Sequence, residues 1–301
     1  QEVMDGRLDA SFQVKGDENG PESDLGPTNN RGRIPGRTFQ YGSVDFQSYA
    51  QNYTPPAADA EPQTVNMPSS CIEIEPHEFG TTDMPSSSDF VPHFHYWATD
   101  PETMDWGWCP QDDTAIHYYS SDRDGLVQFL ETMRMHDGTG LHIGAKYGLA
   151  LLDPANREEV AHLIENGLVD PSFLGRPIDW NDPETEKYLV IMTDGQTTDQ
   201  YRPVDPAAAI NGEVELSQQD GSAHYRRSSK SANVSYLQQQ CALARANGVQ
   251  VFTIAFETND AAAQDMRECA SSESHFFRAQ GEEIHDAFDT VHAFLEIDLL
   301  A

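Results

Sequence analysis

An aspartate at the end of an apolar run is the side chain best placed to bind a ligand. The run, residues 188–192, has strand length and consists of good β-formers, and Thr193, Asp194 and Gly195 follow it. Such a run predicts a strand buried on both faces inside a parallel sheet, ended by a turn at the glycine. Asp194 would then lie at the carboxyl end of the strand, where open α/β sheets bind ligands.

The residues around Asp194 leave two interpretations open. As a metal ligand, the carboxylate would hold a hard cation, directly or through water, together with other oxygens. As a structural residue, it would accept hydrogen bonds from backbone N–H groups and so cap the turn.

Four histidines suggest a second kind of metal site. His93 and His95 are separated by one residue in a segment with the pattern of extended chain, so alternation places both on one face. This spacing can chelate a transition metal, and His77 and His117 are candidates to join them. Solvated or hydrogen-bonded histidines are far commoner, and we favour that interpretation.

Sequence motifs of enzymes are absent. The chain contains no P-loop, no dinucleotide glycine fingerprint and no His-Glu-x-x-His motif. The serine runs at 86–88 and 271–272 contain no Gly-x-Ser-x-Gly nucleophile elbow. We therefore expect a protein that is not an enzyme.

The cysteines predict disulfides rather than a zinc site. None of Cys71, Cys109, Cys241 and Cys269 belongs to a Cys-x-x-Cys pair. An even number in an acidic chain with long loops favours two disulfides outside the cytoplasm. We expect Cys241 to pair with Cys269, because both lie on helical stretches flanking the apolar run 249–256, and this leaves Cys71 for Cys109. Four cysteines allow three pairings, and four free buried thiols are the alternative.

The elements that position Asp194 form a βαβ unit. After the strand at 187–193, residues 234–247 have the pattern of a helix that Gly248 ends, and a second strand follows at 249–256. Such a crossover is almost always right-handed. Apolar spacing predicts further helices at 122–135, 141–152, 155–166, 260–270 and 282–295, and a short strand at 275–278.

Composition divides the chain into three parts. Residues 1–70 have few apolar side chains and predict an irregular, loop-rich segment. Residues 71–120 are rich in proline and aromatic rings and predict an irregular insertion packed on the core. Residues 121–301 predict an α/β domain, a mostly parallel sheet flanked by helices. Within it, 196–232 has the composition of a long polar loop that faces a partner.

Charge narrows the classes of partner. The formal net charge is −32, from 50 acidic and 18 basic residues, which argues against nucleic acid and anionic membrane surfaces. No run of 18 apolar residues occurs, so we expect no membrane span. There is no initiator methionine and no signal-peptide pattern, and we expect a processed form or a piece of a longer protein.

Five segments match a known family in order and spacing: 139–154, 190–195, 241–256, 266–272 and 274–277. With them, the second half of the chain resembles a von Willebrand factor A domain. More narrowly, it resembles the C-terminal part of the TadG-like proteins of tight-adherence (Tad/Flp) pilus systems.

The resemblance implies one divalent ion, Mg²⁺ by default or Ca²⁺, at the carboxyl edge of the sheet. Thr139 matches the ligand of the family's second loop, and Asp194 matches the ligand of its third loop. The first loop should be an Asp-x-Ser-x-Ser after a hydrophobic strand. Asp9, Ser11 and Gln13 give only part of that pattern, and no buried strand precedes them. The resemblance therefore implies a sheet without its first strand and without most of its metal site.

A parallel sheet cannot omit a middle strand without exposing unpaired backbone groups. We therefore expect another polypeptide to complete the sheet, for example the N-terminal part of the same precursor, unless residues 1–70 fill the gap.

Three functions follow. The first hypothesis is a non-catalytic, extracytoplasmic adhesion or assembly module of a Tad-type pilus or surface apparatus, on the bacterial surface or in the periplasm. It would bind protein partners through a divalent ion. The second is a structural subunit of a surface filament or pilus-tip complex that needs no metal. The third is a transition-metal hydrolase that uses the histidines.

Overall fold

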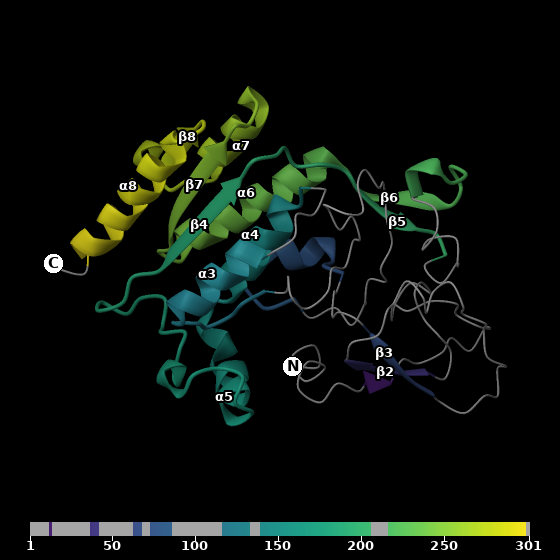
Figure 1. The fold of residues 1–301 in the computed structure, drawn as a ribbon, viewed down its shortest axis with the longest axis horizontal. Coiled ribbons are helices and arrows are strands. Elements are labelled where there is room, and N and C mark those ends of the chain that lie inside the picture. The colour runs from purple at the N-terminus through teal and green to yellow at the C-terminus, as the bar shows by residue number, and fades with distance from the viewer. Residues whose placement is uncertain are drawn as a thin grey trace.

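Three parallel strands form the central sheet of the structure (Figure 1). The computed structural model describes residues 12–13, 37–41, 63–67, 73–85, 116–132, 139–205 and 216–298. The strands are β4 (Tyr188–Thr193), β7 (Gln250–Phe256) and β8 (Phe276–Ala279), in the order β4, β7, β8. Both pairings are parallel, and Tyr188 lies opposite Gln250 in the first. The predicted α/β fold with a mostly parallel sheet is confirmed.

Helices lie on both faces of this sheet. They are α4 (Leu141–Ala150), α6 (Lys230–Ala246), α7 (Asp260–Cys269) and α8 (Glu283–Asp298). The first three share one apolar core with Leu189 and Ile191 of β4. On the other face, the ring of Phe294 in α8 lies 5.5 Å from the ring of Phe252 in β7. Because successive side chains of a strand point to opposite faces, β7 is buried on both.

Side-chain caps start the helices before and after β7. The hydroxyl of Ser229 accepts a hydrogen bond from the backbone N–H of Ala232 at 3.2 Å, and this starts α6. The Asn259 side chain accepts from the N–H of Ala262 at 3.0 Å and starts α7. Gly248 follows the last turn of α6 with a φ of +77°, as predicted for a residue that ends the helix.

Shorter elements surround the sheet. They are α3 (Arg123–Thr132), α5 (Arg157–Glu165), and the 3-10 turns η1 (Pro76–Gly80), η3 (Pro154–Asn156), η4 (Pro171–Phe173), η6 (Leu216–Gln218) and η7 (Glu273–His275). A second sheet contains β1 (Phe12–Gln13), β2 (Arg37–Tyr41) and β3 (Gln63–Met67). No helix within the described ranges is both long and apolar enough to cross a bilayer.

The polar stretch 196–232 is not a loop throughout. β5 (Gln200–Pro203) and β6 (His224–Ser228) pair as an antiparallel hairpin, and α6 begins at Lys230. The prediction of one long loop is therefore wrong. The hairpin is hard to recognise from hydrophobicity, because Arg202 in β5 is buried against Glu73, a carboxylate from a distant part of the chain.

β4 is not the interior strand that its sequence predicts. Within the described part of the chain it pairs with β7 alone, and its other side, on which no described strand lies, is called the free edge of β4 below. Val190 and Met192 are each 41% exposed, whereas Leu189 and Ile191 are buried. The prediction of burial on both faces is wrong here, because α8 packs on β7 and β8 and leaves these two side chains of β4 in solvent.

Candidate functional site

The turn after β4 leaves the Asp194 carboxylate available. The hydroxyl of Thr193 accepts a hydrogen bond from the N–H of Gly195 at 3.1 Å and lies 3.2 Å from the carbonyl oxygen of the same residue. Thr193, rather than Asp194, therefore caps the turn. Asp194 is exposed, and its carboxylate makes no hydrogen bond or ion pair with any residue that the structure describes. Nothing within that part of the chain competes for its oxygens.

Thr139 lies directly beside this turn. A Cβ placed on Gly195 would be 2.6 Å from the Thr139 hydroxyl oxygen, so a larger residue at 195 would force that hydroxyl to move. Two further bonds join them: the N–H of Thr198 donates to the Thr139 carbonyl at 3.2 Å, and the N–H of Thr139 donates to the Thr198 hydroxyl at 3.4 Å. The structure thus brings Thr139 and the Asp194 turn together at the carboxyl end of β4.

The first turn of α6 holds the loop that follows. The amide of Asn233 donates to the carbonyl of Thr198 at 2.8 Å. The N–H of Lys230 donates to the Asp199 carboxylate at 2.5 Å, and this bond lowers the pKa of Asp199, with a smaller contribution from Arg226. The loop from the Asp194 turn to β5 is therefore fastened to a helix at the edge of the sheet.

The described residues do not by themselves fit a complete divalent-ion site. Mg²⁺ requires near-octahedral coordination and Ca²⁺ takes six to eight oxygens. Thr139 and Asp194 offer a hydroxyl and a carboxylate, and no group of three His, Cys, Asp or Glu side chains that could hold a metal exists in the described ranges. Asp9 and Ser11, the partial match to a first loop, lie outside those ranges. The remaining ligands of an ion would have to come from elsewhere.

Half of the histidine site considered from sequence lies outside the described residues. His93 and His95 lie there. His77 belongs to η1 and is exposed, and the ring of His117 lies 4.1 Å from the ring of Phe129.

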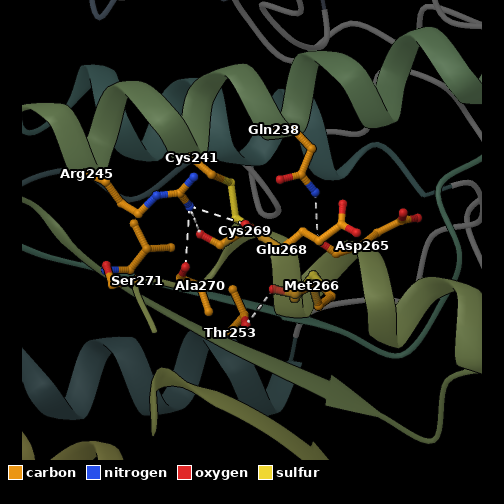
Figure 2. The surroundings of a disulfide bond; sticks show 11 residues. Gln238, Cys241, Arg245, Thr253, Asp265, Met266, Glu268, Cys269, Ala270 and Ser271 are labelled. Carbon is orange, nitrogen blue, oxygen red and sulfur yellow. Dashed lines mark hydrogen bonds between the residues drawn. A yellow bond between two sulfur atoms is a disulfide. The ribbon is translucent and has the colours of Figure 1, made fainter. Parts of the chain in front are cut away.

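A disulfide fixes the core behind the sheet edge. Cys241 in α6 and Cys269 at the end of α7 are bonded, with a Cα–Cα distance of 5.2 Å, and both are fully buried (Figure 2). Arg245 adds a hydrogen bond to the Cys269 carbonyl at 2.5 Å. The predicted pairing of Cys241 with Cys269 is confirmed. Cys71 and Cys109 lie outside the described residues.

Sequence reasoning missed the side chains that hold residues 73–82 onto α4 and α6. The Lys146 ammonium, in α4, donates to the Thr81 carbonyl at 2.9 Å, and the Gln240 amide, in α6, donates to the Phe79 carbonyl at 2.7 Å. The ring of Phe79 stacks on that of Tyr236 at 4.5 Å. Lys146 and Gln240 are fully buried. A lysine inside the otherwise apolar run 141–152 was the one available signal.

Comparison with known proteins agrees with this fold. Residues 175–290 match the family model of the von Willebrand factor type A domain. The matched range contains the three parallel strands, the Asp194 turn and the disulfide, and it has the von Willebrand factor A-like α/β fold. No curated protein matches the chain.

Two solved structures show local similarity. The vWF domain of the type V pili tip protein Mfa5 from Porphyromonas gingivalis is 14% identical over 57% of this chain and 72% of that chain, with a TM-score of 0.32. The pilus adhesin SpaC from Lactobacillus rhamnosus GG is 15% identical over 59% of this chain and 20% of that chain, with a TM-score of 0.31. The fold assignment therefore rests on the family model and on the sheet itself.

Proposed function

We propose that this protein is a non-catalytic, extracytoplasmic adhesion or assembly module of a Tad-type pilus or similar surface apparatus. The observation that carries the proposal is the edge at which the Asp194 turn meets Thr139. There the sheet presents an exposed carboxylate that no described residue neutralises. A fixed, unpaired carboxylate beside a hydroxyl is suited to binding a cation or a cationic group of a partner.

In the first form of this proposal, the protein binds its partner through a divalent ion. The ion would be Mg²⁺ or Ca²⁺, held by Thr139 and Asp194, and its other oxygens would come from a partner. We also propose a partner polypeptide that pairs with β4 and completes the sheet. The free edge of β4 and the exposure of Val190 and Met192 support this, because a buried parallel strand ordinarily has neighbours on both sides.

An extracytoplasmic location is supported by the disulfide. Cys241 and Cys269 are oxidised in the core of the domain, and such bonds persist in oxidising compartments. The surplus of acidic residues suits a protein that stays dissolved outside the cell.

A metal-independent structural subunit of a surface filament or pilus-tip complex is the second candidate. The small number of described oxygens near Asp194 favours it, since a hydroxyl and one carboxylate are fewer ligands than Mg²⁺ requires. In this form the Asp194 edge and the free edge of β4 are contact surfaces only.

Calorimetric titration with Mg²⁺, Ca²⁺ and Zn²⁺ separates these functions. The variants are Asp194→Ala and, as a control, Asp289→Ala, which removes an exposed carboxylate of α8. Binding of Mg²⁺ or Ca²⁺ that is lost in Asp194→Ala alone supports the ion-dependent module. No binding by either ion supports the metal-independent subunit. Tight zinc binding that survives Asp194→Ala would favour a histidine-based hydrolase and contradict both.

A further inference from the structure

We propose that the free edge of β4 docks a strand-forming segment of a partner polypeptide whose apolar core is flanked by lysine or arginine. This inference rests on the proposed partner-binding function and adds the chemistry of the partner. Its starting point is the backbone of residues 189–193 in β4, which pairs on one side with β7 and on the other with no described strand. Unpaired N–H and C=O groups of this kind are a template for strand addition.

The side chains of β4 indicate that the docked segment has an apolar core. Val190 and Met192 are each 41% exposed on the sheet face that α8 occupies over β7 and β8. An apolar side chain on the neighbouring strand would lie about 5 Å from them and bury them. A polar segment would leave both in water.

On the opposite face of the sheet, α4 packs against β4. Two glycines, Gly144 and Gly148, lie four residues apart on one face of α4. A Cβ on Gly148 would be 2.7 Å from the Leu189 side chain, so this glycine permits close packing of α4 on β4. A Cβ on Gly144 would meet nothing within 4 Å, and the residue is exposed.

Gly144 therefore lacks a described neighbour that explains it. A glycine inside a helix is less favourable than alanine, and close approach of another backbone is one compensation. A strand added beyond β4 would pass under the same face of α4 that Gly148 presents to β4. We infer that α4 is already positioned to cover that strand.

Charge selects the partner. Glu186, just before β4, and Asp194, just after it, are both exposed carboxylates. The described hydrogen bonds of Glu186 come from the neutral side chains of Tyr188 and Gln250, which leave its charge in place. Without a bound ion, both ends of the edge therefore present an exposed carboxylate, whereas the Lys187 ammonium beside Glu186 is buried against the carbonyls of Leu152 and Ile178. Cationic residues on either side of the docked core would complement the two carboxylates.

The same charges disfavour a second copy of this chain. Pairing of two β4 edges about a twofold axis is antiparallel, which brings Glu186 of one copy towards Asp194 of the other. Like charges on paired strands are destabilising, and each copy carries a net charge of −32. A partner with basic flanks is favoured over self-association.

Labelled synthetic peptides test the inference. The probe is a six-residue core with valine at alternate positions and two lysines on each flank, compared with the same core flanked by glutamates. A third peptide carries N-methyl groups on alternate core amides and cannot pair its backbone. We expect the lysine-flanked peptide to bind about tenfold more tightly than the glutamate-flanked one and to slow amide exchange at 188–193, and N-methylation to abolish both effects.

Two variants test whether the peptide binds at β4. Met192→Lys should weaken binding of the lysine-flanked peptide, whereas Leu174→Lys, which changes an exposed leucine beside η4, should not. Equal affinity for the lysine-flanked and glutamate-flanked peptides would overturn the inference. So would absence of binding, or slowed amide exchange at segments other than β4. Ion or partner binding that depends on Asp194 and persists without any docking at β4 would overturn this inference alone. Docking at β4 without any effect of Asp194→Ala would instead count against the ion-dependent function.

Discussion

Three consecutive residues at the end of β4 have different roles at the sheet edge. The hydroxyl of Thr193 caps the turn, so the turn does not need a hydrogen bond from the Asp194 carboxylate. Gly195 provides the space in which Thr139 lies. Asp194 can therefore be changed without breaking a described hydrogen bond, which makes Asp194→Ala a clean probe of binding.

Stability of the fold should depend on pH through His142. This side chain is 3% exposed, and burial, aided by the nearby positive charge of Arg202, lowers its pKa from 6.5 to about 4. Between these two values the unfolded chain binds a proton that the folded chain does not. Stability from this group is therefore complete above pH 6.5 and is lost as the pH falls towards 4, by about 3 kcal/mol in total.

Denaturant unfolding at a series of pH values measures this effect. We expect His142→Phe, which does not titrate, to flatten the fall in stability between pH 6.5 and 4. His77→Phe changes an exposed histidine of η1 and should keep the wild-type slope. An unchanged slope in His142→Phe would show that this histidine does not titrate in the folded state as described.

The ion pair of Glu73 with Arg202 should contribute strongly to stability. Both oxygens of Glu73 accept from the guanidinium, at 2.7 and 2.9 Å, and Arg202 is 5% exposed. Glu73→Ala leaves this buried cation without its carboxylate, and we expect a loss of about 3 kcal/mol in the free energy of unfolding. Glu75→Ala removes the more exposed partner of Arg227 and should lose about 1 kcal/mol or less. Equal losses in the free energy of unfolding for Glu73→Ala and Glu75→Ala would contradict the burial of the ion pair between Glu73 and Arg202.

The disulfide links α6 covalently to the end of α7. Its two cysteines are 28 residues apart, and closing a loop of that length stabilises the fold by about 3 to 4 kcal/mol. We expect the Cys241→Ala, Cys269→Ala double variant to lose about that much in urea unfolding. Ser235→Ala, on the exposed side of α6, should stay within about 0.5 kcal/mol of wild type. A double variant as stable as wild type would show that the disulfide does not stabilise the fold by restricting the unfolded chain.

The elements that follow from local sequence could be predicted, and those that depend on distant partners could not. The β4, α6 and β7 unit and the Cys241–Cys269 pair follow from apolar periodicity, from Gly248 and from the position of the cysteines on flanking helices. The β5–β6 hairpin was missed because its buried Arg202 is neutralised by Glu73, over a hundred residues away. The exposed face of β4 was missed because an apolar run does not reveal whether a neighbour is present.

The candidate site, too, could be predicted only in part from local sequence. The Asp194 turn could be placed at the end of a strand from its own sequence, and family resemblance pointed to Thr139. Their contact depends on Gly195 and on the bonds to Thr198, which periodicity does not encode.

For the molecule as a whole, the net charge of −32 should oppose compaction. Raising NaCl from about 0.01 to 0.15 M shortens the Debye length from about 30 to 8 Å and screens this repulsion. We expect the Tm to rise over this range, as measured by circular dichroism. A fall in Tm would mean that attractive pairs such as Arg202 with Glu73 outweigh the general repulsion.

The central claim is that the sheet brings the Asp194 turn and Thr139 into contact at one edge. The most direct test is the coupling energy between Gly195→Val and Thr139→Ala in a double-mutant cycle of unfolding free energies. A Cβ at 195 would lie 2.6 Å from the Thr139 hydroxyl oxygen and 3.7 Å from its two side-chain carbons, so the Thr139 side chain would have to rotate or shift to accommodate valine. The account predicts a loss of about 2 kcal/mol for Gly195→Val alone and recovery of at least about 1 kcal/mol of it when Thr139 is alanine. Strictly additive effects would show that the two segments do not meet and would contradict the account.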